Sequence, residues 1–192
     1  MNNAVPQNNT HVERVRAPEL SLWLLSRGIS SVTTDEIAKL LAIPSNQVPQ
    51  RLASPKRRGE MVLLANGLWV PVPPEHIAWG APPAMDIIDA LMRHMNAEYY
   101  VGWLSAAALH GASHHAPQTF QVAVSHAVRA RMIGRSSLRF YHRGHVSLVG
   151  RVNTEARSGT VAASGRETTM LDIASDIALV GGIDNAANLV AL

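Results

Sequence analysis

The residues best suited to chemistry in this chain are a serine and several histidines in its middle third. Ser105 and His110 offer a nucleophile and a base for covalent catalysis. On a helix, however, a spacing of five residues places two side chains about 140° apart, so these two would not meet. We therefore expect a structural role, in which small residues pack tightly around Ser105 and His110 bonds to a backbone carbonyl.

A metal site is the second chemistry that the histidines suggest. His110, His114 and His115 are close in sequence, but Gly111 interrupts the helix and no acidic residue lies nearby. The chain also contains no cysteine, which excludes thiol catalysis, disulfides and cysteine-based zinc sites. We expect no metal, no cofactor and no catalytic residue.

The same region is strongly basic. Residues 99–154 contain no Asp or Glu, yet they carry six arginines and six histidines. Such a surface attracts phosphates or acidic protein patches, and it lacks the carboxylates that metal-dependent phosphoryl transfer and hydrolysis need. The composition therefore favours a binding protein over an enzyme. The alternative is that these arginines only solvate strands beside acids from elsewhere in the chain.

Five of the arginines form a candidate surface for an acidic partner: Arg129, Arg131, Arg135, Arg139 and Arg143. The first two alternate like one face of a strand. The last three recur every four residues, although Gly134 and the pattern of residues 138–141 argue against a helix. On either geometry we expect a positive face that docks an acidic protein or extends a nucleic-acid footprint.

Length and composition bound the architecture. A chain of 192 residues with 47% hydrophobic residues and a net charge of +3 has one large domain or two small ones. Residues 1–16 are polar and are expected to be flexible. The absence of a signal-like or membrane-spanning apolar stretch predicts a soluble cytoplasmic protein. Residues 188–192 are an apolar run, which leaves a truncated C-terminus open.

Three helices are predicted before residue 60. Pro18 opens the first, and Thr33 with Glu36 forms a capping box that starts the second. Pro44 ends that helix, and a short third helix carries Val48 and Leu52. Pro49 lies in its first turn if Asn46 is the N-cap; otherwise the helix is distorted.

A β-hairpin follows these helices. Residues 61–65 and 68–70 are apolar strands joined by Asn66-Gly67, a turn in which both residues need positive φ. This order of elements predicts a winged helix-turn-helix over residues 17–74. Five prolines between residues 71 and 83 indicate a linker or a stiff crossing segment.

Residues 75–192 are expected to form a second domain of mixed helices and a small sheet, which makes the chain α+β. Helices are predicted at 85–95, at 166–179 and from Asp184 onward. The apolar pattern predicts strands near residues 120–124, 138–140, 146–148 and 161–162.

The first domain is predicted to bind DNA. In a helix-turn-helix the second helix of the unit enters the major groove, and Asn, Gln and Arg there can read adenine and guanine. The expected contacts are Asn46, Gln47, Gln50 and Arg51, the basic run Lys56, Arg57 and Arg58, and Asn66 in the wing. If about four cations each neutralise one phosphate, log K falls with log salt at a slope of about −3.6. The alternative is a winged helix that binds protein.

Several motifs together resemble those of AbiEi-type antitoxins. The most specific is the aromatic and small-residue run of residues 99–111, which ends in an apolar-His-Gly sequence. Residues 121–124 and 166–172 follow at the family's spacing, and Gly181-Gly182 also fits. The wing return at residues 67–70 resembles that of the family's N-terminal domain. The resemblance spans roughly residues 18–192.

The resemblance implies an antitoxin from a bicistronic toxin–antitoxin module linked to abortive phage infection. In this family the N-terminal domain represses the shared promoter by binding inverted repeats in double-stranded DNA. The C-terminal antitoxin domain is needed to neutralise a nucleotidyltransferase-like toxin, without catalysis of its own. This chain departs from the pattern at Pro49 and at its short C-terminal end. The alternative is a winged-helix regulator whose second domain senses a ligand or docks a protein.

Overall fold

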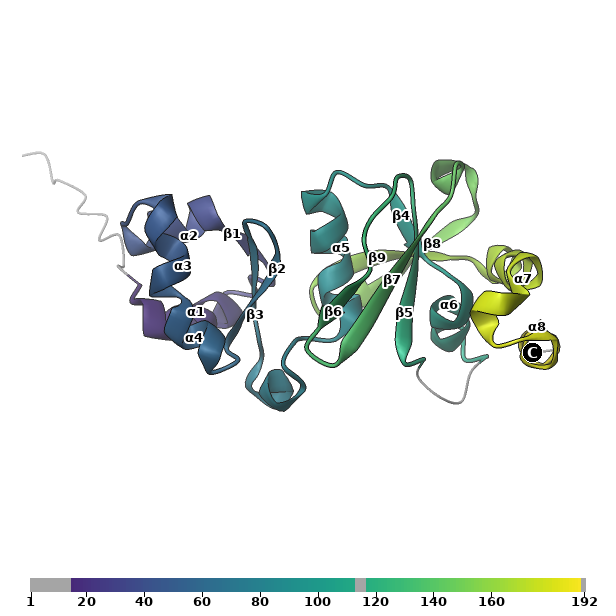
Figure 1. Cartoon of the computed structure of the whole chain (residues 1–192), viewed down its shortest axis with the longest axis horizontal. Coiled ribbons are helices and arrows are strands. Elements are labelled where there is room, and N and C mark those ends of the chain that lie inside the picture. Colours follow the sequence, from purple (N-terminus) through teal and green to yellow (C-terminus); the bar gives the residue numbers. More distant parts are fainter. Residues whose placement is uncertain (1–14, 113–116, 191–192) are drawn as a thin grey trace, which may run out of the picture.

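The computed structural model describes residues 15–112 and 117–190, and it combines helices with two β-sheets (Figure 1). The expected α+β class is therefore confirmed. The elements of the first part are η1 (Ala17–Glu19), α1 (Leu20–Ser26), β1 (Val32–Thr33), α2 (Thr34–Leu41), η2 (Ser45–Gln47), α3 (Val48–Arg51), α4 (Ala53–Arg57), β2 (Met61–Ala65) and β3 (Leu68–Pro71), where η denotes a 3₁₀ helix.

The capping box at the start of α2 is confirmed. The Glu36 backbone N–H donates to the Thr33 hydroxyl at 3.3 Å, and the Thr33 N–H donates to the Glu36 carboxylate at 2.7 Å. These bonds satisfy N–H groups that have no partner within a helix. The helix ends at Ala42, which adopts a left-handed conformation with φ 52°.

The helix after Pro44 is distorted, and the N-cap expected at Asn46 is wrong. Asn46 lies in a 3₁₀ turn, and the helix then breaks at Leu52 into α3 and α4. Pro55 explains the break, because it has no N–H for the Arg51 carbonyl and its ring crowds the preceding turn. Hydrogen bonds of 2.9 Å from Leu52 N to Val48 O and from Lys56 N to Leu52 O keep the two segments aligned.

The hairpin of β2 and β3 is confirmed, but its turn differs from the expected one. Leu63 pairs with Trp69 while Ala65 pairs with Leu68, so Leu64 is a bulge. Gly67 has φ +78°, whereas Asn66 does not adopt positive φ. Because the bulge adds a residue before the turn, only Gly67 needs the left-handed conformation.

A first core lies beneath these elements. The sheet has the order β1-β3-β2, and it packs with α1, α2 and α3 around the buried side chains of Leu20, Leu24, Ile37, Val48, Leu52 and Trp69. Val15 is 7% exposed and belongs to this core, so the expected flexible tail does not extend to that residue. Residues 1–14 lie outside the described part.

The second part contains a larger sheet than expected. Its elements are η3 (Pro74–Trp79), α5 (Ala84–His94), β4 (Tyr99–Val101), α6 (Trp103–Leu109), β5 (Thr119–Val124), β6 (Arg131–Ile133), β7 (Ser136–His142), η4 (Val146–Leu148), β8 (Arg151–Ala156), β9 (Gly159–Ser164), α7 (Arg166–Ser175), η5 (Ile177–Val180) and α8 (Ile183–Val190). The six strands have the order β6-β7-β5-β4-β9-β8. The pairs β4–β9 and β5–β7 are parallel, and the other pairs are antiparallel.

Several predicted boundaries in this part are wrong. Residues 146–148 form a 3₁₀ turn instead of a strand, and α7 ends at Ser175 instead of residue 179. The prolines at residues 71–83 end β3 and begin η3, so the segment is not a plain linker. No helix among residues 15–112 and 117–190 is long and apolar enough to cross a membrane.

Helices cover both faces of the six-stranded sheet. α5 lies on one face, and α6, α7 and α8 lie on the other (Figure 1). Strands buried on both faces need apolar residues throughout, as in Val122, Ala123 and Val124 of β5. On the α5 face the core also includes Leu64 and Leu68, so the β2–β3 hairpin packs against the second part.

Candidate nucleic-acid interface and protein-docking surface

The segment formed by α3 and α4 has one buried and one exposed face. Val48, Leu52 and Pro55 are buried against the first core. Six of the predicted DNA contacts in η2 and in this segment have exposed side chains: Asn46, Gln47, Gln50, Arg51, Lys56 and Arg57. The first two lie in η2 and the other four on the solvent side of the bent α3–α4 segment.

The direction of this face follows from helical geometry. Gln50 and Arg57 are seven residues apart, so they project in nearly the same direction from the aligned α3–α4 segment. Both lie roughly opposite the buried Leu52, because neighbouring helical residues differ by about 100°. At the other end of the segment, the Ser45 hydroxyl donates to the Asp35 carboxylate at 2.7 Å, which fixes η2 against α2.

The cations of this face differ in their availability. Arg58 is held by the Glu60 carboxylate through bonds of 2.8 and 2.7 Å and by the Ser54 hydroxyl at 2.8 Å. The hydrogen bonds from Arg58 also hold the pKa of Glu60 below its ordinary value. Arg51, Lys56 and Arg57 have no ion pair within the described part of the chain. These three are the cations free to meet phosphate.

The turn between β2 and β3, predicted to be a wing, lies apart from this face, beside α5. His94 Nε2 donates to the carbonyl oxygen of Asn66 at 2.8 Å, and Arg131 donates from Nη1 to the Leu64 carbonyl at 3.1 Å. The Asn66 side chain remains exposed. The hairpin is thus fixed to the second part of the chain, and it is not a free arm.

The five arginines of the predicted docking surface do not share one face. Arg131 pairs in register with Leu138, on the α5 face, while Arg139 and Arg143 alternate with Leu138 along β7 and project to the other face. Arg135 lies in the β6–β7 turn, with its guanidinium carbon 6.0 Å from the centre of the Trp79 ring. Arg129 precedes β6 in a loop. The expectation that all five form a single positive face is wrong, because the strand alternation places Arg131 on the opposite face from Arg139 and Arg143.

Arg143 has a structural role beside α6. It forms an ion pair with Asp176 and lies over the Trp103 ring, 5.3 Å from its centre. The Trp103 indole N–H donates to the same carboxylate at 3.0 Å. Arg129, Arg135 and Arg139 are therefore the exposed members of the predicted set.

Ser105 and His110 do not form a catalytic pair. Ser105 accepts the backbone N–H of Gln121 at 2.9 Å and donates to the Thr119 carbonyl at 3.4 Å. His110 Nε2 lies 2.8 Å from the carbonyl oxygen of Ser164. The predicted bond from His110 to a backbone carbonyl is confirmed, and it joins α6 to the end of β9.

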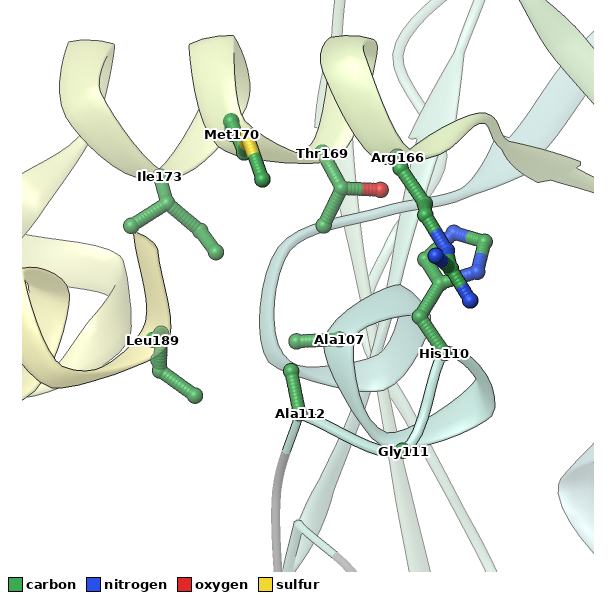
Figure 2. Close-up of a pocket in the computed structure, with 9 residues that line it drawn as sticks. All are labelled: Ala107, His110, Gly111, Ala112, Arg166, Thr169, Met170, Ile173 and Leu189. Carbon is green, nitrogen blue, oxygen red and sulfur yellow. The ribbon is translucent and has the colours of Figure 1, made fainter. Parts of the chain in front are cut away.

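A half-open pocket of about 180 Å³ lies between α6, α7 and α8 (Figure 2). His110 and Arg166 lie together at one end, and Ile173 and Leu189 form the apolar part. Its other lining residues are Ala107, Gly111, Ala112, Thr169 and Met170. His110, near the end of the motif at residues 99–111, and Arg166, the first residue of the motif at residues 166–172, thus lie at the same site.

A buried carboxyl on α7, Asp172, was not singled out as a site from the sequence. Asp172 is 8% exposed; Tyr100 donates a hydrogen bond of 3.3 Å to its Oδ1, and Oδ2 has no hydrogen-bond partner. Burial raises the pKa values of both the Asp172 carboxyl and the Tyr100 hydroxyl. A Cβ at Gly102 would lie 3.3 Å from Oδ2, so glycine leaves room for the carboxyl. The signal was the helical spacing of Asp172 with buried Thr169 and Ile173.

The histidines do not form a group of metal ligands within the described residues. Among residues 15–112 and 117–190, no group of three or more His, Asp or Glu side chains is placed to hold a metal ion. His114 and His115 lie outside the described residues.

Comparison with known proteins supports the assignment of the second part. Residues 100–192 match the family model described as the AbiEi antitoxin C-terminal domain. Among solved structures, the chain is similar to the crystal structure of the RV2827C protein from Mycobacterium tuberculosis, with a TM-score of 0.59 and 19% identity. The match covers 84% of this chain and 61% of that one, and at this identity it shows a shared fold. The comparison with curated proteins found no match.

Proposed function

Because the chain belongs, through residues 100–192, to the AbiEi antitoxin family, we propose that it represses its own promoter and neutralises a nucleotidyltransferase-like toxin. Residues 17–74 are the DNA-binding winged helix-turn-helix in this proposal, and residues 75–192 are the antitoxin domain. The protein acts in the cytoplasm and has no catalytic role of its own.

The arrangement of the first part supports a winged helix. Its elements run α1, β1, α2, α3–α4, β2 and β3, and its sheet has the order β1-β3-β2. α2 and α3–α4 are joined by residues 42–47, which gives the helix–turn–helix unit. The hairpin that follows has the position of a wing.

The single observation that carries the DNA-binding proposal is the exposed face of α3–α4. It combines Gln50, which can pair with adenine, with Arg51, which can pair with guanine. Lys56 and Arg57 add positive charge without an ion pair among the described residues. Since His94 holds the backbone of Asn66, base contacts come mainly from α3–α4, and Asn66 contributes at most through its side chain.

A DNA titration tests this proposal. The full chain is titrated onto labelled DNA from upstream of its own gene, at several salt concentrations and with unrelated DNA as competitor. Three free cations for each bound chain predict a slope of about −2.7 in log K against log salt. Arg57→Ala should reduce the slope by about 1, while Arg139→Ala, in the second part, should not change it. Equal affinity for own and unrelated DNA would refute the repressor proposal.

Toxin neutralisation is assigned to the exposed arginines of the second part. Arg129, Arg135 and Arg139 are exposed, and we propose that they contact an acidic surface of the toxin encoded by the adjacent gene. Reversing all three charges should abolish co-purification with that toxin and leave promoter binding unchanged. Arg131 and Arg143 are left intact because they have structural contacts. Unchanged toxin binding would refute this surface.

The pocket between α6, α7 and α8 favours a second candidate, a ligand-sensing regulator. Its volume of about 180 Å³ is below the roughly 300–1,000 Å³ of ordinary ligand sites. This candidate predicts release of promoter DNA when a small metabolite is added. Screening DNA release with a metabolite library separates it from the antitoxin proposal, which predicts release by none.

A further inference from the structure

The six-stranded sheet ends in an open edge strand, β8. All six of its residues, Arg151–Ala156, pair with β9, and β8 is the last strand in the sheet. Their side chains are exposed or half-buried, and Val152 is 41% exposed. An edge strand of this kind presents unpaired N–H and C=O groups that can pair with another strand.

The ladder shows which backbone groups of β8 are free. The Gly165 N–H donates to the Gly150 carbonyl at 2.9 Å, so residues 150 and 165 are a hydrogen-bonded pair. In an antiparallel ladder, hydrogen-bonded pairs alternate with pairs that are not hydrogen-bonded. Residues 152, 154 and 156 therefore bond to β9, and the N–H and C=O groups of Arg151, Asn153 and Glu155 point away from the sheet.

The opposite edge of the sheet does not offer the same opportunity. β6 has only three residues, Arg131–Ile133, and Arg131 contacts the carbonyl of Leu64 in the first part. β8 is twice as long, contains no proline, and pairs with β9 without a register shift. Proteins commonly protect edges by short strands, prolines, bulges or covering segments, and β8 has none of the first three.

The charges on β8 are complementary under two-fold symmetry. If two β8 strands pair antiparallel about Asn153, then Arg151 lies opposite Glu155 of a second copy, and the reverse pair forms on the other side. Neither side chain has an ion pair within the described part of the chain. Four residues of extended strand also hold the two about 13 Å apart in one chain, so they cannot pair with each other.

We propose that β8 is a dimerisation edge, on which a second copy of this chain adds its own β8 antiparallel about Asn153. In this register the outward-pointing groups of residues 151, 153 and 155 meet their equivalents and exchange N–H···O bonds. Two ion pairs between Arg151 and Glu155 lie at the ends of the interface, and Val152 faces Thr154 of the second copy. The two sheets become one continuous sheet.

The dimer does not depend on the proposed DNA function, but it would explain one part of it. A two-fold dimer presents two DNA-binding domains related as the halves of an inverted repeat. This consequence rests on the proposed repressor function. Dimerisation is measured without DNA, so the two proposals fail independently.

A charge-swap series tests the interface. The mass of the full chain is measured by sedimentation equilibrium and light scattering from about 1 to 100 µM. Arg151→Glu and Glu155→Arg each place like charges opposite one another twice, and each should weaken dimerisation about tenfold or more. The double variant R151E/E155R should restore it. Arg139→Glu, on an inner strand, is the matched control and should leave the mass unchanged.

A second variant tests the backbone pairing. Asn153→Pro removes an N–H that points away from β9, so the fold should persist, as circular dichroism can verify, while the dimer is lost. A chain that stays monomeric throughout the concentration range overturns the proposal. A dimer that neither the single charge reversals nor N153P weakens also overturns it. Loss of toxin binding by N153P in a monomeric chain would instead assign this edge to a toxin strand.

Discussion

Arg131 of β6 donates from Nη1 to the carbonyl oxygen of Leu64 in β2, at a distance of 3.1 Å. Leu64 is the bulged residue of the hairpin, so its carbonyl is not fully occupied by the β2–β3 ladder. The bond therefore joins the six-stranded sheet to the three-stranded one. It also explains why an arginine that the sequence places in a docking surface is half-buried instead.

Removal of the Arg131 side chain should destabilise the whole chain. Arg131→Ala leaves the Leu64 carbonyl without this donor, and a hydrogen bond from a charged group contributes about 1.5–3 kcal/mol to stability. Arg139→Ala removes an exposed arginine from the same sheet and should cost less than about 0.5 kcal/mol. Urea unfolding of both variants measures the difference. Equal stabilities would show that the Arg131–Leu64 bond contributes nothing.

The buried Asp172 predicts an unusual pH dependence of stability. Burial raises the pKa of this carboxyl in the folded chain, so between the unfolded and folded pKa values the folded state binds more protons. The contribution of Asp172 is fully present below the unfolded pKa, and it is lost as the pH rises through the folded pKa. The wild-type chain should therefore lose stability relative to Asp172→Asn as the pH rises from 4 to 7.

The control for this titration is Tyr100→Phe. The Tyr100 hydroxyl donates to Asp172 and lowers the pKa of that carboxyl, so removing it should move the loss of stability to higher pH. Unfolding by urea at each pH supplies the free energies. If the free energy of unfolding changed with pH in the same way for wild type and Asp172→Asn, this would contradict a raised pKa of the Asp172 carboxyl.

The elements governed by local signals were predictable from the sequence. The Thr33–Glu36 capping box, the hairpin around Gly67 and the α5 helix all depend on neighbouring residues, and all three are present. The break at Leu52 was also accessible, because Pro55 removes a helical donor whatever surrounds it.

Features set by long-range contacts were not predictable in the same way. β8 carries no apolar alternation, and only its pairing with β9 makes it a strand. The docking arginines were separated by the orientation of β6 and β7, which no spacing in the sequence specifies. Asp172 became a buried carboxyl because Tyr100, 72 positions away, lies beside it.

A close backbone approach makes Gly134 intolerant of a side chain. It has φ +56°, and a Cβ there would lie 2.4 Å from the Trp79 carbonyl oxygen and 2.8 Å from the Gly80 carbonyl carbon. Gly134→Ala should destabilise the chain by more than about 2 kcal/mol, since it combines backbone strain with a steric clash. Gly28→Ala is the control, because φ is +68° there but no atom lies within 4 Å. The Tm of each variant is measured by thermal unfolding. An equal decrease in Tm for Gly134→Ala and Gly28→Ala would show that the η3 segment moves away freely.

The capping box of α2 provides a test of the helix that packs beside the proposed DNA-binding face. Thr33→Ala removes the hydroxyl that accepts the Glu36 N–H, and loss of such a cap costs about 1 kcal/mol. Thr33→Ser keeps the hydroxyl and should retain most of that stability. The backbone N–H of Thr33 and, next, its hydroxyl lower the pKa of Glu36, and the hydroxyl bond to the Glu36 carboxylate, at 2.8 Å, is the one that Thr33→Ala removes. The Glu36 contribution is therefore present above its unfolded pKa and is lost as the pH falls through the folded value. Urea unfolding at pH 7 and pH 3 should show a smaller penalty for Thr33→Ala at the lower pH, because protonation of Glu36 weakens the bond that its carboxylate accepts from the Thr33 hydroxyl. A penalty that is the same at both pH values would mean that the bond from the Thr33 hydroxyl to the Glu36 carboxylate does not contribute to the cap.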